Sequence, residues 1–291
     1  MDSRFSPAKG GQYTSVSSHD DSAAVSTVPE QRGSGDRSPA KAPAASLWEM
    51  PLLAHRPGSR AERFAVATGT RHPVIVFLLA AVTGLLLICA VSIAVGFLVT
   101  EFLLDDAWVR SADEELPQWL ADNRSDTLTD FSYVGSEMAG RVVLPALVGI
   151  LAIVFAVMRK WRAAAFAVFV LVVESATYRA TSMADARQRP DVPRLEDLPV
   201  DASYPSGHTA AAVAVYAGLV LLITSRFTNS RTRAALWTVA VTIVTFVAMS
   251  RMYRGMHHPI DVIAGLLVGC AAIAVLVFAC RAAAAAKELR A

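Results

Sequence analysis

The residues Ser250-Arg-Met-Tyr-Arg-Gly-Met-His-His-Pro-Ile-Asp261 form a short polar stretch between two long apolar runs. The stretch holds two adjacent histidines and, four residues after the first of them, an aspartate. Pro259 stands where a new helix is expected to begin, because its missing N–H is not needed in the first turn of a helix. Asp261 would then lie in that first turn, within reach of the His257 imidazole.

This pattern suits phosphoryl transfer. A carboxylate on one ring nitrogen of His257 fixes the tautomer and leaves the other nitrogen free to attack or to accept a proton. The guanidinium of Arg251 matches phosphate oxygens as a fork. Two alternatives remain at this point: the polar residues simply line a loop between membrane spans, or His257, His258 and Asp261 bind a metal ion. The flanking arginines argue against a cation there.

Apolar residues dominate most of the chain. The 291 residues are 54% hydrophobic, although the first quarter is polar. Several windows approach or exceed the ~20 apolar residues that cross a bilayer as a helix. We predict an all-α bundle of six transmembrane helices, at about 72–99, 141–157, 163–181, 207–224, 234–249 and 260–280. A net charge of +2 without a basic stripe argues against a nucleic-acid partner.

Composition divides the chain into three parts. Residues 1–72 have too few large apolar side chains to offset the entropy of ordering, so a disordered cytoplasmic tail is expected. No apolar segment closely follows the first Met, so no cleavable signal peptide is expected. Residues 73–280 would form the six-span core, and residues 281–291 a short cytoplasmic C-terminal tail. An apolar patch at 48–53 could contact the membrane or a partner, but it is assigned to chance.

Basic residues gather before the first span, in alternate short connections and after the last span. They include Arg60, Arg63, Arg71, Arg159, Lys160, Arg162, Arg226, Arg231, Arg233, Arg281, Lys287 and Arg290. Such loops favour the cytoplasm. We therefore expect a multi-pass protein of the plasma membrane with both termini in the cytoplasm. The loops at 182–206 and 250–259 would then lie together on the outer face.

Three other features carry expectations. The acidic segment after the first span, which includes Asp113, is interpreted as an amphipathic surface helix with a solvated acidic face, followed by a loop. Glu174, inside the third span, should face the bundle and a cation, either Arg179 or Arg251. The GxxxG pattern at 265–269 favours a helix contact within the bundle over a dimer interface. An oligomer is possible but not indicated.

Two further polar segments fall on the predicted outer side, Arg187-Gln-Arg-Pro190 after the third span and Tyr204-Pro-Ser-Gly-His208 at the start of the fourth. Free N–H groups at a helix start favour an anion, and Gly lets the backbone approach closely. With the 250–261 stretch, these segments resemble the type 2 phosphatidic acid phosphatase superfamily and its KxxxxxxRP, PSGH and SRxxxxxHxxxD motifs. The resemblance covers residues 73–280. The second and third motifs match in full, whereas Ser182 stands where the first motif has Lys.

The resemblance implies a lipid phosphatase that needs neither metal nor cofactor and forms a phosphohistidine. His257 would attack phosphorus with Asp261 orienting it, and His208 would act first as acid and then as base. The residues implied to hold the phosphate oxygens are Arg189, Ser206, Gly207 and Arg251. Arg179 or Arg187 could replace the missing Lys, and His258 would be a bystander.

The substrate implied is a lipid phosphate or diphosphate, such as phosphatidate, phosphatidylglycerophosphate or a polyprenyl diphosphate. One alternative is a membrane phosphotransferase of the same superfamily. Another is a non-enzymatic lipid-binding or transport protein, which would be expected to gather its polar residues at mid-membrane rather than at one interface. The interpretation requires the imidazoles of His208 and His257 to face one another across a pocket for one phosphoryl group.

Overall fold

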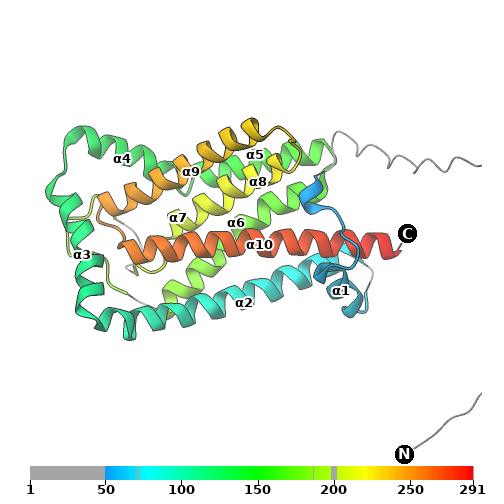
Figure 1. The fold of residues 1–291 in the computed structure, drawn as a ribbon, viewed down its shortest axis with the longest axis horizontal. Coiled ribbons are helices and arrows are strands. Elements are labelled where there is room, and N and C mark those ends of the chain that lie inside the picture. Colours follow the sequence, from blue (N-terminus) through cyan, green and yellow to red (C-terminus); the bar gives the residue numbers. More distant parts are fainter. Residues whose placement is uncertain (1–49, 71, 186, 198–201, 291) are drawn as a thin grey trace, which may run out of the picture. The chain divides into compact units, whose positions relative to one another are not determined.

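The structure, a computed structural model, describes residues 50–70, 72–185, 187–197 and 202–290. This part of the chain is built from helices and contains no strand (Figure 1). The elements before the third span are η1 (Pro51–Leu53), α1 (Arg60–Ala67), α2 (Pro73–Glu101), η2 (Leu103–Asp105), α3 (Ala107–Asp122), α4 (Asp126–Met138) and α5 (Val143–Val157). They are followed by α6 (Trp161–Ala184), α7 (Gly207–Ala212), the π-helical turn η3 (Val213–Ala217), α8 (Gly218–Thr224), α9 (Ser230–Tyr253) and α10 (Pro259–Arg290).

Within the described residues, six helical segments are long and apolar enough to cross a bilayer. They are Pro73–Asp105, Asp126–Val157, Trp161–Ala184, Gly207–Thr224, Ser230–Tyr253 and Pro259–Arg290. A helix satisfies its own backbone hydrogen bonds, which is why this architecture is stable in lipid. The prediction of an all-α, six-span membrane protein is confirmed.

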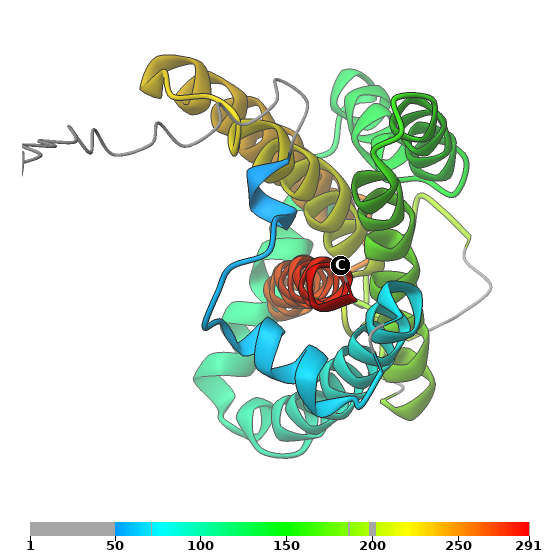
Figure 2. The same ribbon diagram turned by 90° about the vertical axis from the view of Figure 1, so that its right-hand side faces the viewer.

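Helix α10 runs through the middle of the bundle and packs against α2, α6 and α7 (Figure 2). Two glycines make the contact with α7 close. A β-carbon added to Gly265 would lie 2.5 Å from the Ser206 carbonyl oxygen, and one added to Gly269 would lie 2.6 Å from that of Ala210. The expected role of the GxxxG pattern as a helix contact within the bundle is confirmed. This contact holds the start of α7 beside the first turns of α10.

The boundary expected for the N-terminal tail is wrong at its C-terminal side. Residues 1–49 lie outside the described residues, but η1 and α1 are folded against the end of α10. Leu53 is only 1% exposed, and the Phe64 ring packs edge-on against that of Phe278. The Arg281 Nε donates a hydrogen bond to the Leu52 carbonyl oxygen (2.8 Å). The apolar residues at 52–53 therefore contribute to packing, contrary to the assignment to chance.

The segment expected to form a short C-terminal tail from residue 281 is helical, because α10 continues to Arg290. Alanine has the highest helix propensity, and the run of alanines at 282–286 is buried. Burial against α1 and η1 gives this last part of the helix an apolar partner.

The acidic segment after the first span contains α3, as expected, but helix α4 follows in place of the expected loop. The Ser125 side chain caps α4 by accepting from the Leu128 N–H, and α4 packs along α9. Helix α3 lies across one end of the bundle (Figure 1). Its buried residues are Asp113, Pro117 and Leu120.

Candidate active site

The three polar segments singled out in the sequence meet at the end of the bundle that α3 covers. Backbone hydrogen bonds tie them together. The Ser203 N–H donates to the Arg187 carbonyl oxygen (2.8 Å), and the Ser206 N–H donates to the Asp261 carbonyl oxygen (2.9 Å). The structure therefore places the loop after α6, the start of α7 and the start of α10 in direct contact.

The turn between α9 and α10 is shaped by Gly255, whose φ is +72°. Its N–H donates to the Met252 carbonyl oxygen, and the Met256 N–H donates to that of Arg251, both at 3.0 Å. This is the Schellman arrangement that ends many helices, and glycine adopts the required left-handed conformation without a steric penalty. The turn delivers His257 and His258 to the site immediately after the last turn of α9.

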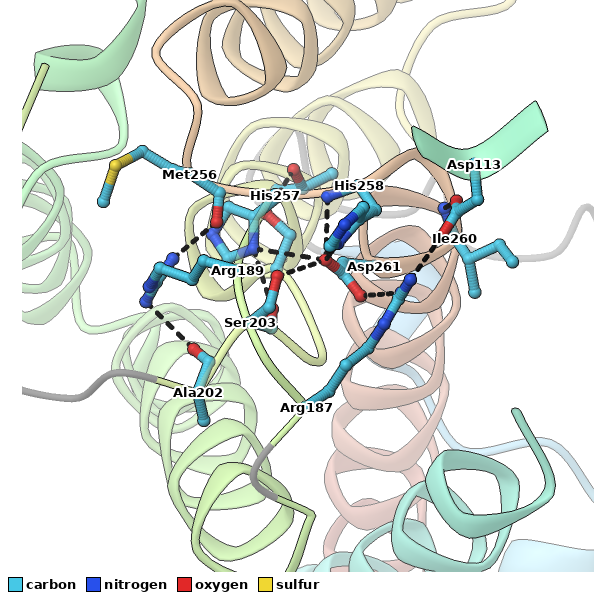
Figure 3. Close-up of polar contacts among 12 residues, drawn as sticks. Asp113, Arg187, Arg189, Ala202, Ser203, Met256, His257, His258, Ile260 and Asp261 are labelled. Atoms are coloured by element: carbon cyan, nitrogen blue, oxygen red, sulfur yellow. Dashed lines mark hydrogen bonds and ion pairs between the residues drawn. The ribbon is translucent and has the colours of Figure 1, made fainter. Parts of the chain in front are cut away.

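His257 is buried, and its Nδ1 lies 2.8 Å from the Ser203 carbonyl oxygen (Figure 3). Because a carbonyl oxygen only accepts, Nδ1 carries the proton and Nε2 keeps its lone pair. Burial lowers the pKa of His257 well below its usual value; Arg251, Arg189 and His208 lower it further, and the Asp261 carboxylate only partly opposes them. The ring is therefore neutral at neutral pH.

Asp261 is fully buried in the first turn of α10. Its carboxylate accepts from the Ser203 hydroxyl and from the His258 N–H (2.8 Å). Its nearest approach to His257 Nδ1 is 3.9 Å, an ion-pair distance rather than a hydrogen bond. The expected direct hydrogen bond from His257 to Asp261 is thus replaced by one to the Ser203 carbonyl. His258, expected to be a bystander, also places its Nδ1 3.3 Å from the Asp261 carboxylate.

Arg187 bridges two buried carboxylates (Figure 3). Its Nη1 donates to Asp261 (2.5 Å) and its Nη2 to Asp113. Although burial alone lowers the pKa of Arg187, the two carboxylates raise it overall. Asp113 also accepts from the Ile260 N–H (2.9 Å), which caps the start of α10 from another helix. This chain of contacts links α3, the loop after α6 and Asp261.

Asp113 was expected on a solvated acidic face, and that expectation is wrong, since the residue is 2% exposed. A signal was present in the sequence. Asp113 precedes Leu116, Pro117 and Leu120 at helical spacing, so it shares the apolar face of α3.

Arg251 is fully buried at the end of α9. Its Nη1 donates to the Ser136 hydroxyl and to Glu196 (2.7 Å). Its Nε and Nη2 are buried and have no hydrogen-bond partner among the described residues. Since unpaired buried donors of a cation are costly, these two groups are available to an anion. Phosphate binding by Arg251 stays a prediction.

Glu196, which sequence reasoning missed, pairs with both Arg251 and Arg254. Burial alone raises the pKa of Glu196, but the charge and hydrogen bond of Arg251 outweigh burial and bring it to about 2. The carboxylate is therefore ionised at neutral pH. No local pattern marks Glu196, because its partners Arg251 and Arg254 lie 55 and 58 positions later in the chain.

The other expected phosphate-binding residues also lie at this end of the bundle. Arg189 donates to the carbonyl oxygens of Met256 (2.5 Å) and Ala202 (2.9 Å), so part of its guanidinium holds the loops together. The Ser206 hydroxyl hydrogen-bonds to that of Thr209 (2.9 Å). A β-carbon on Gly207 would press on the Tyr178 ring at 3.0 Å. The phosphate-binding roles of Arg189, Ser206 and Gly207 stay predictions.

Among the described residues, the contacts support neither expected substitute for the missing motif Lys. The Ser182 hydroxyl donates to the Tyr178 carbonyl oxygen (2.6 Å) within α6. Arg179 is exposed on α6, and Arg187 is engaged by Asp113 and Asp261. Both substitute roles therefore stay predictions without support from these contacts.

Glu174 faces the bundle interior, as expected, but no ion pair with a cation is found among the described residues. Its carboxylate accepts from the Ser175 hydroxyl (3.0 Å), and Oε1 is buried without a hydrogen-bond partner. Neither Arg179 nor Arg251 is its partner, because the first is exposed and the second pairs with Glu196.

A cavity of about 640 Å³ lies between α3 and this network. It reaches Arg187, Arg189 and His258 on one side and the polar face of α3 on the other. Polar ligands can therefore approach the loops of the site from this side.

Six apolar helices and a network of buried histidine, arginine and carboxylate side chains define an integral membrane protein with a polar site at one end of its helical bundle. The chain belongs to the PAP2 superfamily, because the model of that family matches residues 85–284. It is thus a multi-pass membrane protein of a lipid phosphatase family.

Three relatives illustrate the similarity. An undecaprenyl-diphosphatase of Sulfolobus acidocaldarius is 40% identical over 75 residues, which cover 26% of this chain and 32% of that protein. The crystal structure of a PAP2-type phosphatidylglycerolphosphate phosphatase from Bacillus subtilis has a TM-score of 0.55 and 22% identity, covering 70% of this chain and 94% of that one. That of Aquifex aeolicus LpxE has a TM-score of 0.43 and 24% identity, over 56% and 93% of the two chains. The Bacillus structure supports the fold.

Proposed function

We propose that this protein hydrolyses a lipid phosphate or diphosphate without a metal ion, through a phosphohistidine at His257. One observation carries the proposal. His257 has its Nδ1 proton bound to the Ser203 carbonyl, which leaves the Nε2 lone pair for attack, and it lies in the field of Arg251, whose Nε and Nη2 have no hydrogen-bond partner in the described part of the chain.

In the first step, Nε2 of His257 attacks the terminal phosphorus. The bond from this phosphorus to the leaving oxygen breaks; that oxygen belongs to the lipid alcohol in a monoester and to the lipid phosphate in a diphosphate. His208 donates the proton that the leaving oxygen takes up. The ring of His257 becomes positive as the P–N bond forms, and the Ser203 carbonyl and the Asp261 carboxylate stabilise it. Arg251 and Arg189 stabilise the charge on the non-bridging oxygens.

In the second step, His208 accepts a proton from water, and the water oxygen attacks phosphorus. The P–N bond breaks, inorganic phosphate leaves, and His257 returns to its neutral form with the proton on Nδ1. The same residue thus acts as acid and then as base.

Asp113 and Arg187 act as positioning residues in this scheme. Neither residue contacts the reacting atoms in this scheme. Arg187 donates to one carboxylate oxygen of Asp261, and the Ser203 hydroxyl donates to the other. A carboxylate held from both sides cannot rotate away when His257 becomes charged.

A polyprenyl diphosphate is the first substrate to test. The relative with 40% identity over 75 residues is named an undecaprenyl-diphosphatase, and the site lies at the end of the bundle, where a polar headgroup can enter while lipid tails stay in the bilayer. Phosphatidate and phosphatidylglycerophosphate complete the panel as monoesters.

The test uses the full chain purified in detergent and measures release of inorganic phosphate from these three lipids. We expect His257→Ala and His208→Ala each to lower the rate by roughly two or more decades, the scale of general acid–base catalysis. Labelled phosphate should be trapped on the wild-type protein in an acid-labile, base-stable form, and not on His257→Ala. Near-wild-type release by both variants would overturn the mechanism.

Two further measurements separate the alternatives. Activity that survives a chelator excludes a metallohydrolase of His257, His258 and Asp261. Phosphate that carries one oxygen atom from labelled water identifies a hydrolase, whereas phosphoryl transfer to an added alcohol without such labelling identifies a phosphotransferase.

We also propose that the site faces the outer side of the plasma membrane. The opposite end of the bundle carries the basic connections, among them Arg159, Lys160 and Lys287, and such residues favour the cytoplasm. A C-terminal fusion to green fluorescent protein should then fluoresce. A C-terminal alkaline phosphatase fusion that is active in the periplasm or outside the cell would contradict this orientation.

A further inference from the structure

A second cavity, of about 620 Å³, lies at the end of the bundle opposite the candidate active site. It lies between the start of α2, the turn from α5 to α6, η1 and the last turns of α10. Its interior is apolar and includes Phe77, Leu78 and Phe169. Ala283 and Ala284 of α10 also line it, and their small side chains leave space there.

The rim of this cavity is basic. The basic lining residues are Arg159, Lys160, Arg162 and Lys287, and no Asp or Glu is among the described residues that line it. Arg162 donates to the Leu53 carbonyl oxygen (3.1 Å). Arg159, Lys160 and Lys287 make no ion pair within the described ranges of the chain. Several cations around one cavity without a carboxylate create a positive potential that favours an anion.

The backbone of Arg159 provides a second, independent observation. Its φ is +58°, in the left-handed region. The Arg159 N–H donates to the Ala156 carbonyl oxygen (2.8 Å) and the Lys160 N–H to that of Phe155 (2.7 Å). Helix α5 therefore ends in the same Schellman arrangement as α9, but with Arg at the position where α9 has Gly255. A side chain is disfavoured in this conformation. Arg159 therefore occupies the rim of the cavity at a steric cost that glycine would avoid.

We propose that this cavity binds an anionic phospholipid, with its phosphodiester at the basic rim and an acyl chain in the apolar interior. Basic pockets between transmembrane helices are suited to anionic lipid headgroups. Trp161, at 67% exposure, lies beside the rim, and tryptophan favours the headgroup level of a bilayer. This site is distinct from the proposed catalytic function and does not depend on it.

The test is native mass spectrometry of the delipidated full chain with dioleoylphosphatidylglycerol or dioleoylphosphatidylcholine. We expect one phosphatidylglycerol to be retained in preference to phosphatidylcholine. The double variant Lys160→Gln/Lys287→Gln should weaken retention by about five-fold per charge removed. The matched control is Arg231→Gln/Arg233→Gln, which removes the same charge from exposed residues at the start of α9, outside this cavity, and it should bind as the wild type does.

A second variant separates binding from folding. Arg159→Gly should lower retention of phosphatidylglycerol several-fold, yet its melting temperature in lipid-free detergent should equal or exceed that of the wild type, since glycine relieves the strained backbone. A fall in both properties would indicate a structural role for Arg159 and overturn its assignment.

Other outcomes would also overturn the proposal. Equal retention of phosphatidylglycerol by the Lys160→Gln/Lys287→Gln variant and its control would place the lipid elsewhere. Displacement of the lipid by glycerol 3-phosphate at equal concentration would identify a site for free phosphates. Binding only by a chain that starts at Met50 would identify the chain's own N-terminal segment as the occupant.

Discussion

The two ends of the bundle use charge in opposite ways. At the candidate active site, carboxylates and guanidinium groups are buried and paired, as in the contacts of Arg187 with Asp113 and Asp261. At the other end, Arg159, Lys160 and Lys287 surround an apolar cavity that no described carboxylate lines. Buried pairs are strongly coupled to the fold, because removing one partner leaves the other charge uncompensated. Cations at an open rim keep their charge available for a ligand, and losing one should disturb the fold little.

The largest difference between the ends should follow from Arg187→Gln. This substitution leaves the Asp113 and Asp261 carboxylates buried without their cation, which should destabilise the protein by about 3–5 kcal/mol. Lys160→Gln at the other end should change stability by less than about 0.5 kcal/mol. A denaturant titration in detergent measures the free energy of unfolding of both variants. Similar values for the two variants would break the comparison.

A smaller effect is expected where α10 meets α7. In Gly265→Ala the new β-carbon would lie 2.5 Å from the Ser206 carbonyl oxygen, so α7 must move, at about 1–3 kcal/mol for overpacking. Phosphate release should fall as well, because Gly207 and His208 begin that helix. Gly149→Ala is the control, since nothing lies within 4 Å of a β-carbon there, and it should be neutral or stabilising. Equal activity of the two variants would contradict this prediction.

The C-terminal ends of α5 and α9 share the Schellman arrangement, so opposite substitutions can be compared at the equivalent positions Arg159 and Gly255. Gly255→Ala should destabilise by at least about 1–2 kcal/mol, because a side chain is disfavoured in the left-handed region and the new β-carbon would also lie 2.8 Å from Val192 Cγ2. Arg159→Gly should stabilise the lipid-free protein by up to about 1 kcal/mol. Melting temperatures of the two variants in the same detergent should therefore move in opposite directions. A shift in the same direction would show that the Arg159 side chain stabilises the fold itself.

The smallest change is one of pH. Because the pKa of His257 is lowered in the folded state, the unfolded chain binds a proton below about pH 6.5 that the folded chain does not. The contribution of His257 to stability is therefore present above that pH and lost as the pH falls below it. The acid limb that His257 imposes on kcat/KM should lie below about pH 6.5. Melting temperatures between pH 8 and 5 should fall less for His257→Gln than for the wild type, and parallel curves would contradict the assignment.

Much of the fold was predictable because a membrane span depends on the hydrophobicity of consecutive residues. Runs of apolar side chains predict helices in lipid, and the start of the span Gly207–Thr224 coincides with the PSGH motif. The wrong boundaries lie near the two ends of the chain, where a helix forms only because it packs against another element. Residues 60–67 are too few to span a bilayer and carry three charges, yet they form α1 with Ala61 and Ala65 buried. The alanines at 282–286 were assigned to a tail because their sequence does not indicate that they pack against α1 and η1.

The candidate site could be predicted where its residues belong to a motif, and could not be predicted where contacts join segments far apart in the chain. His208, His257 and Asp261 follow from spacing and resemblance. The Ser203 carbonyl, which takes the place expected for Asp261 on Nδ1, is a backbone group and has no sequence signature. The ion pair of Glu196 with Arg251 could not be predicted either, because the two residues lie 55 positions apart in the chain. Asp113 could have been found from its helical spacing with Leu120, but only its contact with Arg187 gives it a role.

From the sequence alone, the six spans, the segments that approach one another and the residue types suited to a phosphoryl group could be derived, because hydrophobic length and motif spacing are local properties. Only the tertiary structure decided which carboxylate meets which arginine and which ring nitrogen of His257 stays free. It alone also brought the basic residues at 159–162 and 287 to one cavity. Those contacts join residues far apart in the chain, and their energies depend on burial and distance, which arise only when the helices pack.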